Sequence, residues 1–293
     1  MLNDSYDMKG YRALEDYSFL MSVYHKENPQ LLREAIESML NQTQKSEEIF
    51  IVCDGPLTSE LDAVLEEYRE KAPKLFTVFR LPKNIGLGGA LAEGILHCRN
   101  ELVARMDSDD ISLPDRMEKT LAFFCQNPDL SVVGGQIAEF SGSISKVLDY
   151  RRVPASDSEI RQMLKKRNPM NHVTTVMKRS DVIACGNYEN VYGFEDYVLW
   201  ANMLHAGKRF GNIDALCVYV RVDDDMYKRR SGKKCYQGAV VLEKTLKNNC
   251  EITRFEYMKN IAVRFIGYRV IPNFARKVLY QTMLREKQIP QHS

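Results

Sequence analysis

Short apolar runs alternate with amphipathic stretches along the first 110 residues of the chain. The apolar runs have the length and composition of buried strands, and the stretches between them repeat their apolar residues at helical spacing. This alternation predicts an α/β fold with a mostly parallel central sheet and helices on both faces. The four predicted strands lie at residues 19–24, 48–53, 75–81 and 102–106.

Polar and glycine-containing clusters follow three of these runs. Asp54-Gly55 ends the second strand, a Gly-rich loop at residues 82–89 follows the third, and residues 107–110 follow the fourth. Ligands of open α/β sheets bind beyond the carboxyl ends of the strands. We therefore expect the three clusters to face one crevice, which we interpret as an active site.

The remainder of the chain carries weaker signals. Further strands are expected at residues 130–140, 174–177 and 215–220, and a helix at 236–246. Residues 252–285 alternate apolar and basic side chains at helical spacing, with a break at Pro272. We predict a catalytic domain over residues 1–220 and a basic, helical C-terminal extension over 221–293.

Composition narrows the class of protein. The chain has 293 residues and 44% apolar residues, enough for one sizeable core. It contains no apolar run of about 18 residues, the length that spans a bilayer, and residues 1–16 do not resemble a targeting segment. The seven cysteines include no C-x-x-C pair, so a disulfide framework or zinc site is not expected.

The net charge of +2 conceals an asymmetry. From residue 221 onward, 16 Lys and Arg face 7 Asp and Glu, a local net charge of +9; the rest of the chain carries −7. An anionic partner is therefore expected at the C-terminal third.

Two acidic pairs carry candidate chemistry. Asp107 and Asp109, at i and i+2 of an extended segment, point the same way and suit a hard cation such as Mn2+ or Mg2+ that bridges a diphosphate. The alternative is an acidic turn that caps the next helix. Glu195-Asp196 precedes an apolar-patterned stretch; it can supply a general base, or it can only stabilise a helix N-terminus.

In these motifs the chain resembles glycosyltransferase family 2, the inverting family with a GT-A fold. The resemblance covers roughly residues 17–220, with the motifs in the family's order and spacing. The matching segments are residues 19–24 followed by Glu27, Asp54-Gly55, Asn84-Ile85-Gly86, 104–110 and 193–200.

The resemblance implies roles for residues on the donor side. Val23, Tyr24 and the adjoining Ser22 would line a uridine pocket, and Asp54 would bind the uracil ring or else only shape its turn. The remaining implied contacts to the donor come from Glu27, Lys83, Asn84, Gly86, Arg105, Asp107 and Ser108, with Arg105 supporting the acidic cluster from behind.

The resemblance also implies how the metal and the base are provided. Asp109 would ligate Mn2+ or Mg2+. Asp107 would contact the ribose or a water on the metal, and is also a candidate metal ligand. Asp110 would be a second ligand or a helix cap. Asp196 would be the base that deprotonates the acceptor, and Glu195 would contact the acceptor or orient Asp196.

The acceptor side is less defined. His172, Arg229 and Arg230 are candidate contacts to the acceptor or the diphosphate. The basic, aromatic-rich tail is typical of amphipathic helices that lie on an anionic membrane, or of ordinary helices packed on the catalytic domain. It resembles that of bacterial enzymes for surface polysaccharides, including amylovoran and O-antigen galactosyl- and glucosyltransferases.

That looser resemblance implies a specific reaction. A hexose, galactose or glucose, would move from a UDP-sugar to a GlcNAc or GalNAc unit on a diphosphate-linked polyprenyl lipid, at the cytoplasmic face of a bacterial plasma membrane. One alternative is a nucleotidyltransferase, but no glycine follows the first strand at Tyr24. The other is a basic nucleic-acid-binding protein, which would leave the acidic residues unused.

Overall fold

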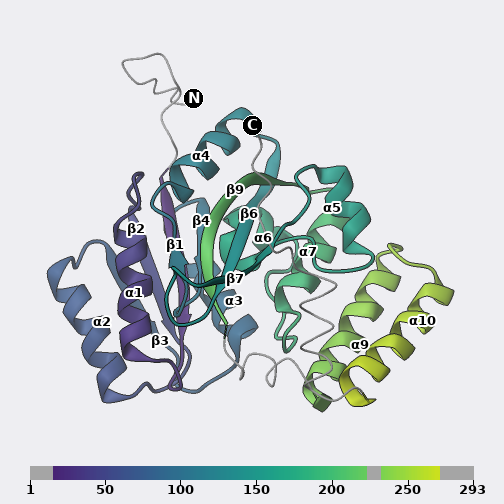
Figure 1. Cartoon of the computed structure of the whole chain (residues 1–293), viewed down its shortest axis with the longest axis horizontal. Coiled ribbons are helices and arrows are strands. Elements are labelled where there is room, and N and C mark those ends of the chain that lie inside the picture. Colours follow the sequence, from purple (N-terminus) through teal and green to yellow (C-terminus); the bar gives the residue numbers. More distant parts are fainter. Residues whose placement is uncertain (1–15, 223–231, 271–293) are drawn as a thin grey trace.

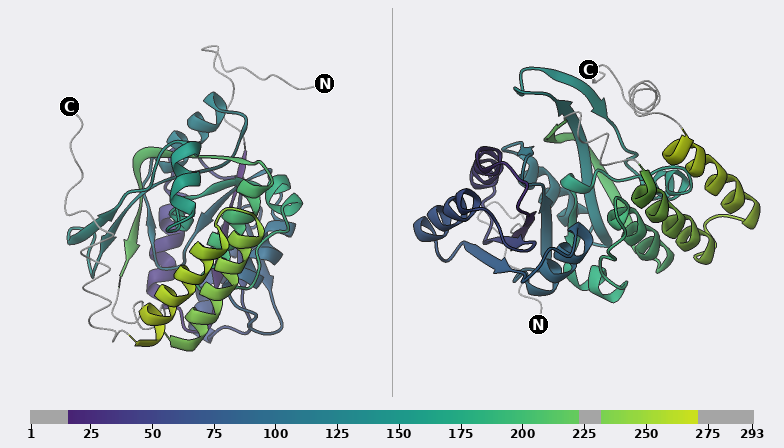
Figure 2. Two further views of the ribbon diagram at one scale, coloured as in Figure 1. Left: turned by 90° about the vertical axis from the view of Figure 1, so that its right-hand side faces the viewer. Right: turned by 90° about the horizontal axis from the view of Figure 1, so that it is seen from below.

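The computed structural model describes residues 16–222 and 232–270 (Figure 1). Within this part of the chain, nine strands form one sheet in the order β3-β2-β1-β4-β8-β6-β9-β5, and β7 pairs with β6 beside this path. Helices cover both faces of the sheet (Figures 1 and 2). The predicted α/β fold is confirmed.

The first half of the chain builds the parallel part of the sheet. All pairings among its four strands are parallel, and the predicted runs match them to within two residues. The strands are β1 (Tyr17–Val23), β2 (Glu48–Cys53), β3 (Phe76–Arg80) and β4 (Leu102–Met106).

The connecting helices begin where local chemistry favours a helix N-terminus. Asn28 accepts hydrogen bonds from the N–H groups of Gln30 and Leu31, and Pro29 opens the first turn, so α1 begins at once. Thr58 caps the second helix in the same way. The helices are α1 (Pro29–Leu40), α2 (Ser59–Lys71) and α3 (Leu87–His97).

Alternating side chains of β1 divide the core into two layers. Phe19, Met21 and Val23 belong to the buried cluster that contains the apolar residues of α1 and α2, whereas Leu20 belongs to the cluster built with α3. This period-two division is what a strand with helices on both sides requires. The predicted burial of both faces is confirmed.

The sheet becomes mixed beyond β4. Strand β8 (Val176–Lys178) lies between β4 and β6 (Leu130–Phe140) and runs antiparallel to both, whereas β6 and β9 (Arg209–Arg221) are parallel. The expected strand at 174–177 is shorter than predicted because η1 (His172–Thr174) is a 3-10 helix. The other elements of this half are β5 (Ile111–Ser112), α4 (Arg116–Gln126), β7 (Val147–Arg151), α5 (Asp157–Leu164), α6 (Arg179–Ala184) and α7 (Glu195–His205).

Residues 232–270 form a helical pair that packs at one side of the sheet and its helices (Figure 2). Helix α9 (Gly232–Asn248) buries Ala239, Leu242 and Leu246 in the same apolar cluster as α7. Helix α10 (Arg254–Phe265) follows and continues into the π-helix η2 (Ile266–Val270). No described helix has the length and apolar character needed to cross a membrane.

Candidate active site

The carboxyl ends of β1, β2 and β4 lie at one edge of the sheet because these strands are parallel neighbours. Val23 pairs with Cys53, and the N–H of Asp54 donates to the carbonyl of Val23 at 2.7 Å. Met21 pairs with Met106, so the acidic loop leaves the sheet beside the end of β1. The strand-end clusters therefore lie at one edge of the sheet, as predicted, and their forming one active-site crevice stays a prediction.

The loop that follows β1 is a tight turn. Tyr24 and Glu27 are both half-buried, and the N–H of Glu27 donates to the carbonyl of Tyr24 at 3.0 Å. The turn leads into α1 without a glycine. It therefore lacks the Gly-rich phosphate loop that a nucleotidyltransferase would need here.

Asp54 is buried, with 3% of its surface exposed, and it organises the loop that follows β3. One carboxylate oxygen accepts from the N–H of Ile85 at 2.7 Å and the other from the N–H of Gly86 at 3.0 Å. Asn84 donates its amide to the carbonyl of Asp54 at 3.2 Å. The turn-shaping role of Asp54 is thus observed, and its contact with a uracil ring stays a prediction.

This loop also packs against the segment that carries the second acidic pair. Gly86 has a φ of 87°, and Asn190 donates its side-chain amide to the carbonyl of Ile85. A Cβ on Gly88 would lie 2.5 Å from the carbonyl oxygen of Glu189 and 3.0 Å from the Cβ of Glu195. Only glycine permits this close approach. Lys83 and Asn84 are exposed nearby.

The acidic loop is braced by a buried arginine. Arg105, on β4, is 2% exposed, and its Nη1 lies 2.5 Å from Oδ1 of Asp107, whose side chain is 40% exposed. Ser108 is buried, and Asp109 is half-buried. The arrangement places Arg105 behind the cluster, where the sequence predicted it, and leaves the Asp107 carboxylate open to solvent.

Asp110 faces the interior and accepts a hydrogen bond from the N–H of Arg221 at 2.8 Å. Burial, followed by the charges of Asp109 and Asp107, raises its pKa well above the usual range. The next helix begins at Arg116 with Asp115 at its N-cap, so the interpretation of Asp110 as a helix cap is wrong. Its backbone contact ties the loop to the end of β9.

Arg221 clamps this loop with its side chain as well. Its Nε donates to the carbonyl of Asp109 at 3.1 Å, and its Nη2 lies 2.8 Å from Oε2 of Glu34 on α1. Nη1 donates to the carbonyl of Gly142, and the guanidinium lies over the Phe140 ring at 4.6 Å. One side chain thus joins α1, the acidic loop and the turn between β6 and β7.

The family resemblance implies metal-dependent binding of UDP. Replacing Arg221 with Met is expected to weaken this binding about tenfold, which is the usual cost of losing a residue that orients a metal-binding group. The apolar stem would remain, while the three polar contacts to Asp109, Glu34 and Gly142 would be lost. Calorimetric titration of UDP in Mn2+ tests this. Arg152→Met removes a comparable surface ion pair, with Asp214, and should leave the affinity unchanged; equal losses in both variants would contradict the clamp.

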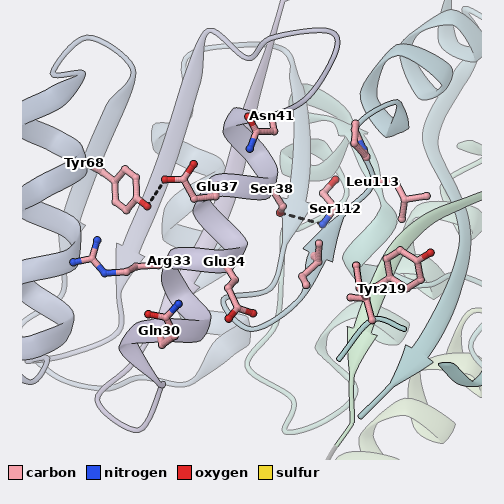
Figure 3. A pocket seen from close by; sticks show the side chains of 13 residues that line it. Gln30, Arg33, Glu34, Glu37, Ser38, Asn41, Tyr68, Ser112, Leu113 and Tyr219 are labelled. Atoms are coloured by element: carbon pink, nitrogen blue, oxygen red, sulfur yellow. Dashed lines mark hydrogen bonds between the residues drawn. The ribbon is translucent and has the colours of Figure 1, made fainter. Parts of the chain in front are cut away.

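A cavity of about 690 Å3 lies on the α1 side of this clamp (Figure 3). Glu34 and Glu37 of α1 form one wall, and Tyr219 of β9 and Leu113 lie opposite. None of the predicted site residues lines it. The acidic residues that the sequence predicts for the donor site lie at the strand-end loops, outside this cavity.

Glu195 and Asp196 form the first turn of α7, and each is 9% exposed. Asn168 donates its amide to Oδ2 of Asp196 at 2.6 Å, and the N–H of Tyr197 donates to Oδ1 at 2.7 Å. These bonds fix the orientation of the Asp196 carboxylate. Burial, followed by the charge of Asp196, raises the pKa of Glu195 to about 7, and Asp107 adds to this rise.

The raised pKa of Glu195 has a consequence for stability. Between its ordinary value of 4.5 and about 7, the folded protein holds a proton that the unfolded chain lacks, so stability falls as pH rises through this window. Glu195→Gln mimics the protonated form and should raise the free energy of unfolding at pH 8 by about 1–3 kcal/mol. Near pH 4 the gain should vanish.

Urea unfolding of metal-free protein at pH 4, 6 and 8 tests this expectation. Glu70→Gln, a change at an exposed position of α2, serves as the matched control and should behave like the parent chain at each pH. A Glu195→Gln protein that is less stable at pH 8 would show that the Glu195 carboxylate is stabilising when ionised.

His172 is held by aromatic neighbours. Its Nε2 lies 2.8 Å from the Tyr188 hydroxyl, and its ring meets Trp200 edge-on at 6.0 Å. Burial, followed by the charge of Arg105, lowers its pKa well below the usual range, so the ring is neutral at pH 7. Its contact to an acceptor or diphosphate stays a prediction. Arg229 and Arg230 lie outside the described residues.

The carboxylates of the acidic loop are suitable ligands for a hard divalent cation that is shared with substrate phosphates. Among residues 16–222 and 232–270, no three His, Cys, Asp or Glu side chains gather as a preformed metal site. Asp107 and Asp109 are instead two partly accessible carboxylates on one loop. Mg2+ or Mn2+ bound through one or two carboxylates takes its other ligands from phosphates and water. The residues fit such an ion.

Sequence reasoning missed several residues that build the site. Arg116 is fully buried and donates to the carbonyl of Arg105 at 2.8 Å, supporting the end of β4 from below. Asn168 and Asn190 donate hydrogen bonds to Asp196 and Ile85, which lie 28 and 105 residues away in the sequence. Isolated Arg and Asn residues carry no periodic signal, so the sequence alone offered little to identify them.

Comparison with known proteins agrees with this geometry. Residues 18–185 match the family profile described as glycosyl transferase family 2. An uncharacterized glycosyltransferase of Haemophilus influenzae is 43% identical over 271 residues, which is 92% of this chain and 99% of the relative. A UDP-Gal:alpha-D-GlcNAc-diphosphoundecaprenol beta-1,3-galactosyltransferase of Escherichia coli is 33% identical over 92% of this chain and 96% of its own length.

A solved structure of similar fold is that of S. aureus TarS residues 1–349 in complex with UDP-GlcNAc. It aligns with a TM-score of 0.60 at 16% identity, covering 92% of this chain and 76% of that chain. At this identity the likeness concerns the fold, which agrees with the predicted GT-A class. The profile match and the full-length relatives set aside the nucleotidyltransferase and nucleic-acid-binding alternatives. The chain belongs to glycosyl transferase family 2 and is a glycosyltransferase.

Proposed function

We propose that this enzyme transfers a hexose, galactose or glucose, from a UDP-sugar to a GlcNAc or GalNAc unit on a diphosphate-linked polyprenyl lipid. The reaction would invert the anomeric carbon and build a surface polysaccharide at the cytoplasmic face of a bacterial plasma membrane. The Escherichia coli relative, named for transfer from UDP-Gal to such a lipid, supports this choice of donor and acceptor.

One observation carries the proposal. The loop that Asp54 organises leads into α3, where a Cβ on Gly88 would lie 3.0 Å from the Cβ of Glu195, so the strand-end loops and the Glu195-Asp196 pair are close neighbours. The charges of Arg105 and Asp107 also act on Glu195. In this proposal Asp196 is the base and the acidic loop binds the diphosphate, which are the two parts that a direct displacement needs.

The proposed reaction is a single displacement. The acceptor hydroxyl oxygen bonds to the anomeric carbon of the donor while the bond from that carbon to the β-phosphate oxygen breaks. The hydroxyl proton passes to the Asp196 carboxylate, whose orientation Asn168 fixes at 2.6 Å. UDP departs with the bonding electrons. A cation held by Asp109 and Asp107 would stabilise the charge that grows on the departing diphosphate.

The loops also have binding roles in this proposal. A uridine would lie at the ends of β1 and β2, which are formed by Val23, Tyr24 and Asp54. The backbone of Asn84-Ile85-Gly86, which Asp54 holds through two hydrogen bonds, would pass beside the nucleotide. Lys83 is exposed on the same loop and would meet a phosphate. Glu195 would face the acceptor sugar from beside Asp196.

The test is UDP release from a panel of UDP-sugars, with Mn2+ or EDTA, in the presence and absence of a synthetic GlcNAc-diphosphate-lipid. Release from one donor that requires metal and rises with the acceptor is the expected result. Release that is indifferent to the lipid acceptor would reject the proposed acceptor. Failure to bind UDP at all would reject the proposed donor.

A further inference from the structure

The inner face of α10, toward α9, is partly polar: it presents an asparagine and an arginine as well as Tyr257, which packs on the apolar cluster. Asn260 donates to Oε2 of Glu243 at 2.8 Å, and Arg264 Nη2 lies 3.0 Å from Oε1. Glu243 itself is only 1% exposed. Because polar groups take up part of the inner face to meet this buried carboxylate, several large apolar residues of α10 lie on its outside.

The outer face of α10 is an exposed apolar stripe. Phe255 is 80% exposed, Met258 64% and Val263 59%, and the helix buries none of its residues. Phe265 and Ile266 extend the stripe at 47% and 50% exposure. Phe265 packs edge-on against Tyr236 of α9 with the ring centroids 5.6 Å apart, so the most exposed members of the stripe are Phe255, Met258 and Val263. Helix α10 lies at the outer edge of the molecule (Figures 1 and 2). A contiguous apolar surface of this kind marks an interaction site.

Basic side chains flank the stripe. Arg254, Lys259 and Arg269 are all exposed around the same outer face. The one acidic residue of α10, Glu256, is engaged at its N-terminus, where it accepts from both the N–H and the hydroxyl of Thr253. The stripe therefore presents large apolar side chains among cations, the pattern of a helix lying in the interface of an anionic bilayer.

We propose that the outer face of α10 is the surface on which this enzyme docks on an anionic lipid bilayer, with Phe255, Met258 and Val263 inserted between headgroups. This deepens the proposed function and rests on it for the reason to dock, since a polyprenyl acceptor resides in the bilayer. A second copy of the chain fits the face less well, because a two-fold contact would bring the same cations together.

The docked helix lies directly behind the proposed base. The Arg264 guanidinium is 5.7 Å from the centre of the Phe194 ring, and Tyr268 meets that ring edge-on at 6.2 Å. Phe194 is the N-cap residue of α7, immediately before Glu195 and Asp196. Docking through the outer face thus places the bilayer and the acceptor-activating pair on opposite sides of one helix.

The experiment is vesicle cosedimentation of the full chain with vesicles of pure phosphatidylcholine or of phosphatidylcholine with phosphatidylglycerol. We expect binding to the anionic vesicles only. Phe255→Ser/Met258→Ser should lower the partition coefficient at least tenfold, and Lys259→Gln about fivefold, the cost of one interfacial cation. Leu96→Ser, at a 49% exposed leucine of α3, is the matched control and should bind like the parent.

Two further measurements separate the outcomes. Sedimentation velocity without lipid shows whether the parent chain self-associates through this face; a dimer that dissociates in Phe255→Ser/Met258→Ser would overturn the proposal in favour of a protein interface. Transfer to a short, water-soluble diphosphate-linked acceptor should be the same in the parent and in this variant. If the parent does not transfer sugar to this acceptor, the proposed function is contradicted and the docking surface is not. If the parent does not bind anionic vesicles, or if Phe255→Ser/Met258→Ser binds them as well as the parent does, the docking surface is overturned and the proposed function is not.

Discussion

Replacing Asp196 with Asn is expected to lower kcat for sugar transfer by about 100- to 10,000-fold, the range that general bases contribute. An amide has no basic lone pair for the acceptor proton, so the displacement would proceed without proton removal. UDP-sugar binding should persist, because the acidic loop on β4 and the Asp54 loop remain intact. Steady-state transfer assays together with UDP titration would measure the two quantities separately.

The Asn replacement has a structural cost that the experiment must include. Asp196 accepts from both Asn168 and the N–H of Tyr197, and an amide can accept only through its one oxygen. Asp196→Ala, which removes both acceptors, should therefore show the same loss of kcat with a lower melting temperature. Asp214→Asn, at a 49% exposed carboxylate paired with Arg152, is the control and should retain full activity.

A fully active Asp196→Asn enzyme would remove Asp196 from the role of base. Glu195 would then be the group to test, because its raised pKa and its position beside Asp196 suit proton transfer near neutral pH. Glu195→Gln separates the two assignments: under the proposed mechanism it should alter the acceptor KM more than kcat. A loss confined to kcat in that variant would make Glu195 the base.

The parallel half of the fold was predictable because its signals are local. Strand composition, the Asn28-Pro29 helix start and the Asp54-Gly55 turn each act within a few residues. Once the parallel order is inferred, the meeting of strand-end clusters follows from geometry alone. The predicted position of Arg105 behind the acidic cluster came from the family pattern, and the structure places it there.

What the sequence did not reveal depends on contacts between distant segments. Arg221 reaches Asp109 and Glu34 across 112 and 187 residues, and nothing in its neighbourhood distinguishes it from the basic residues that follow. The insertion of β8 between β4 and β6 is likewise a matter of tertiary pairing, for which a three-residue strand carries almost no pattern.

The C-terminal helix shows a third limit. Its alternating basic and apolar residues predicted an amphipathic helix, but not which side would face the protein. Arg264 turns inward to the buried Glu243, while Phe255 and Met258 remain outside. The contacts of Asn260 and Arg264 with the buried Glu243 of α9 fix which side of α10 faces the protein, together with the inward packing of Tyr257. The spacing of residues in the sequence does not reveal such partners.

Replacing Asp109 with Ala is expected to abolish the effect of metal on donor binding. Loss of residues that only orient metal ligands costs about 10- to 100-fold in affinity, so loss of a direct ligand should cost at least about 100-fold. UDP affinity in Mn2+ should then fall to the value measured for the parent chain in EDTA. Isothermal titration of UDP against both proteins, with and without Mn2+, gives the four affinities required.

The matched control for that prediction is Asp115→Ala. Asp115 lies six residues further along and is partly exposed, and it pairs with Lys119 on α4 rather than facing the strand ends. It should therefore leave the metal dependence intact. If Asp109→Ala retained Mn2+-stimulated UDP binding while Asp107→Ala lost it, the ligand would be Asp107. Asp107 already forms an ion pair with Arg105, with 2.5 Å between Nη1 and Oδ1. To ligate the metal it would have to give up this partner, so the acidic loop would have to move when the donor binds.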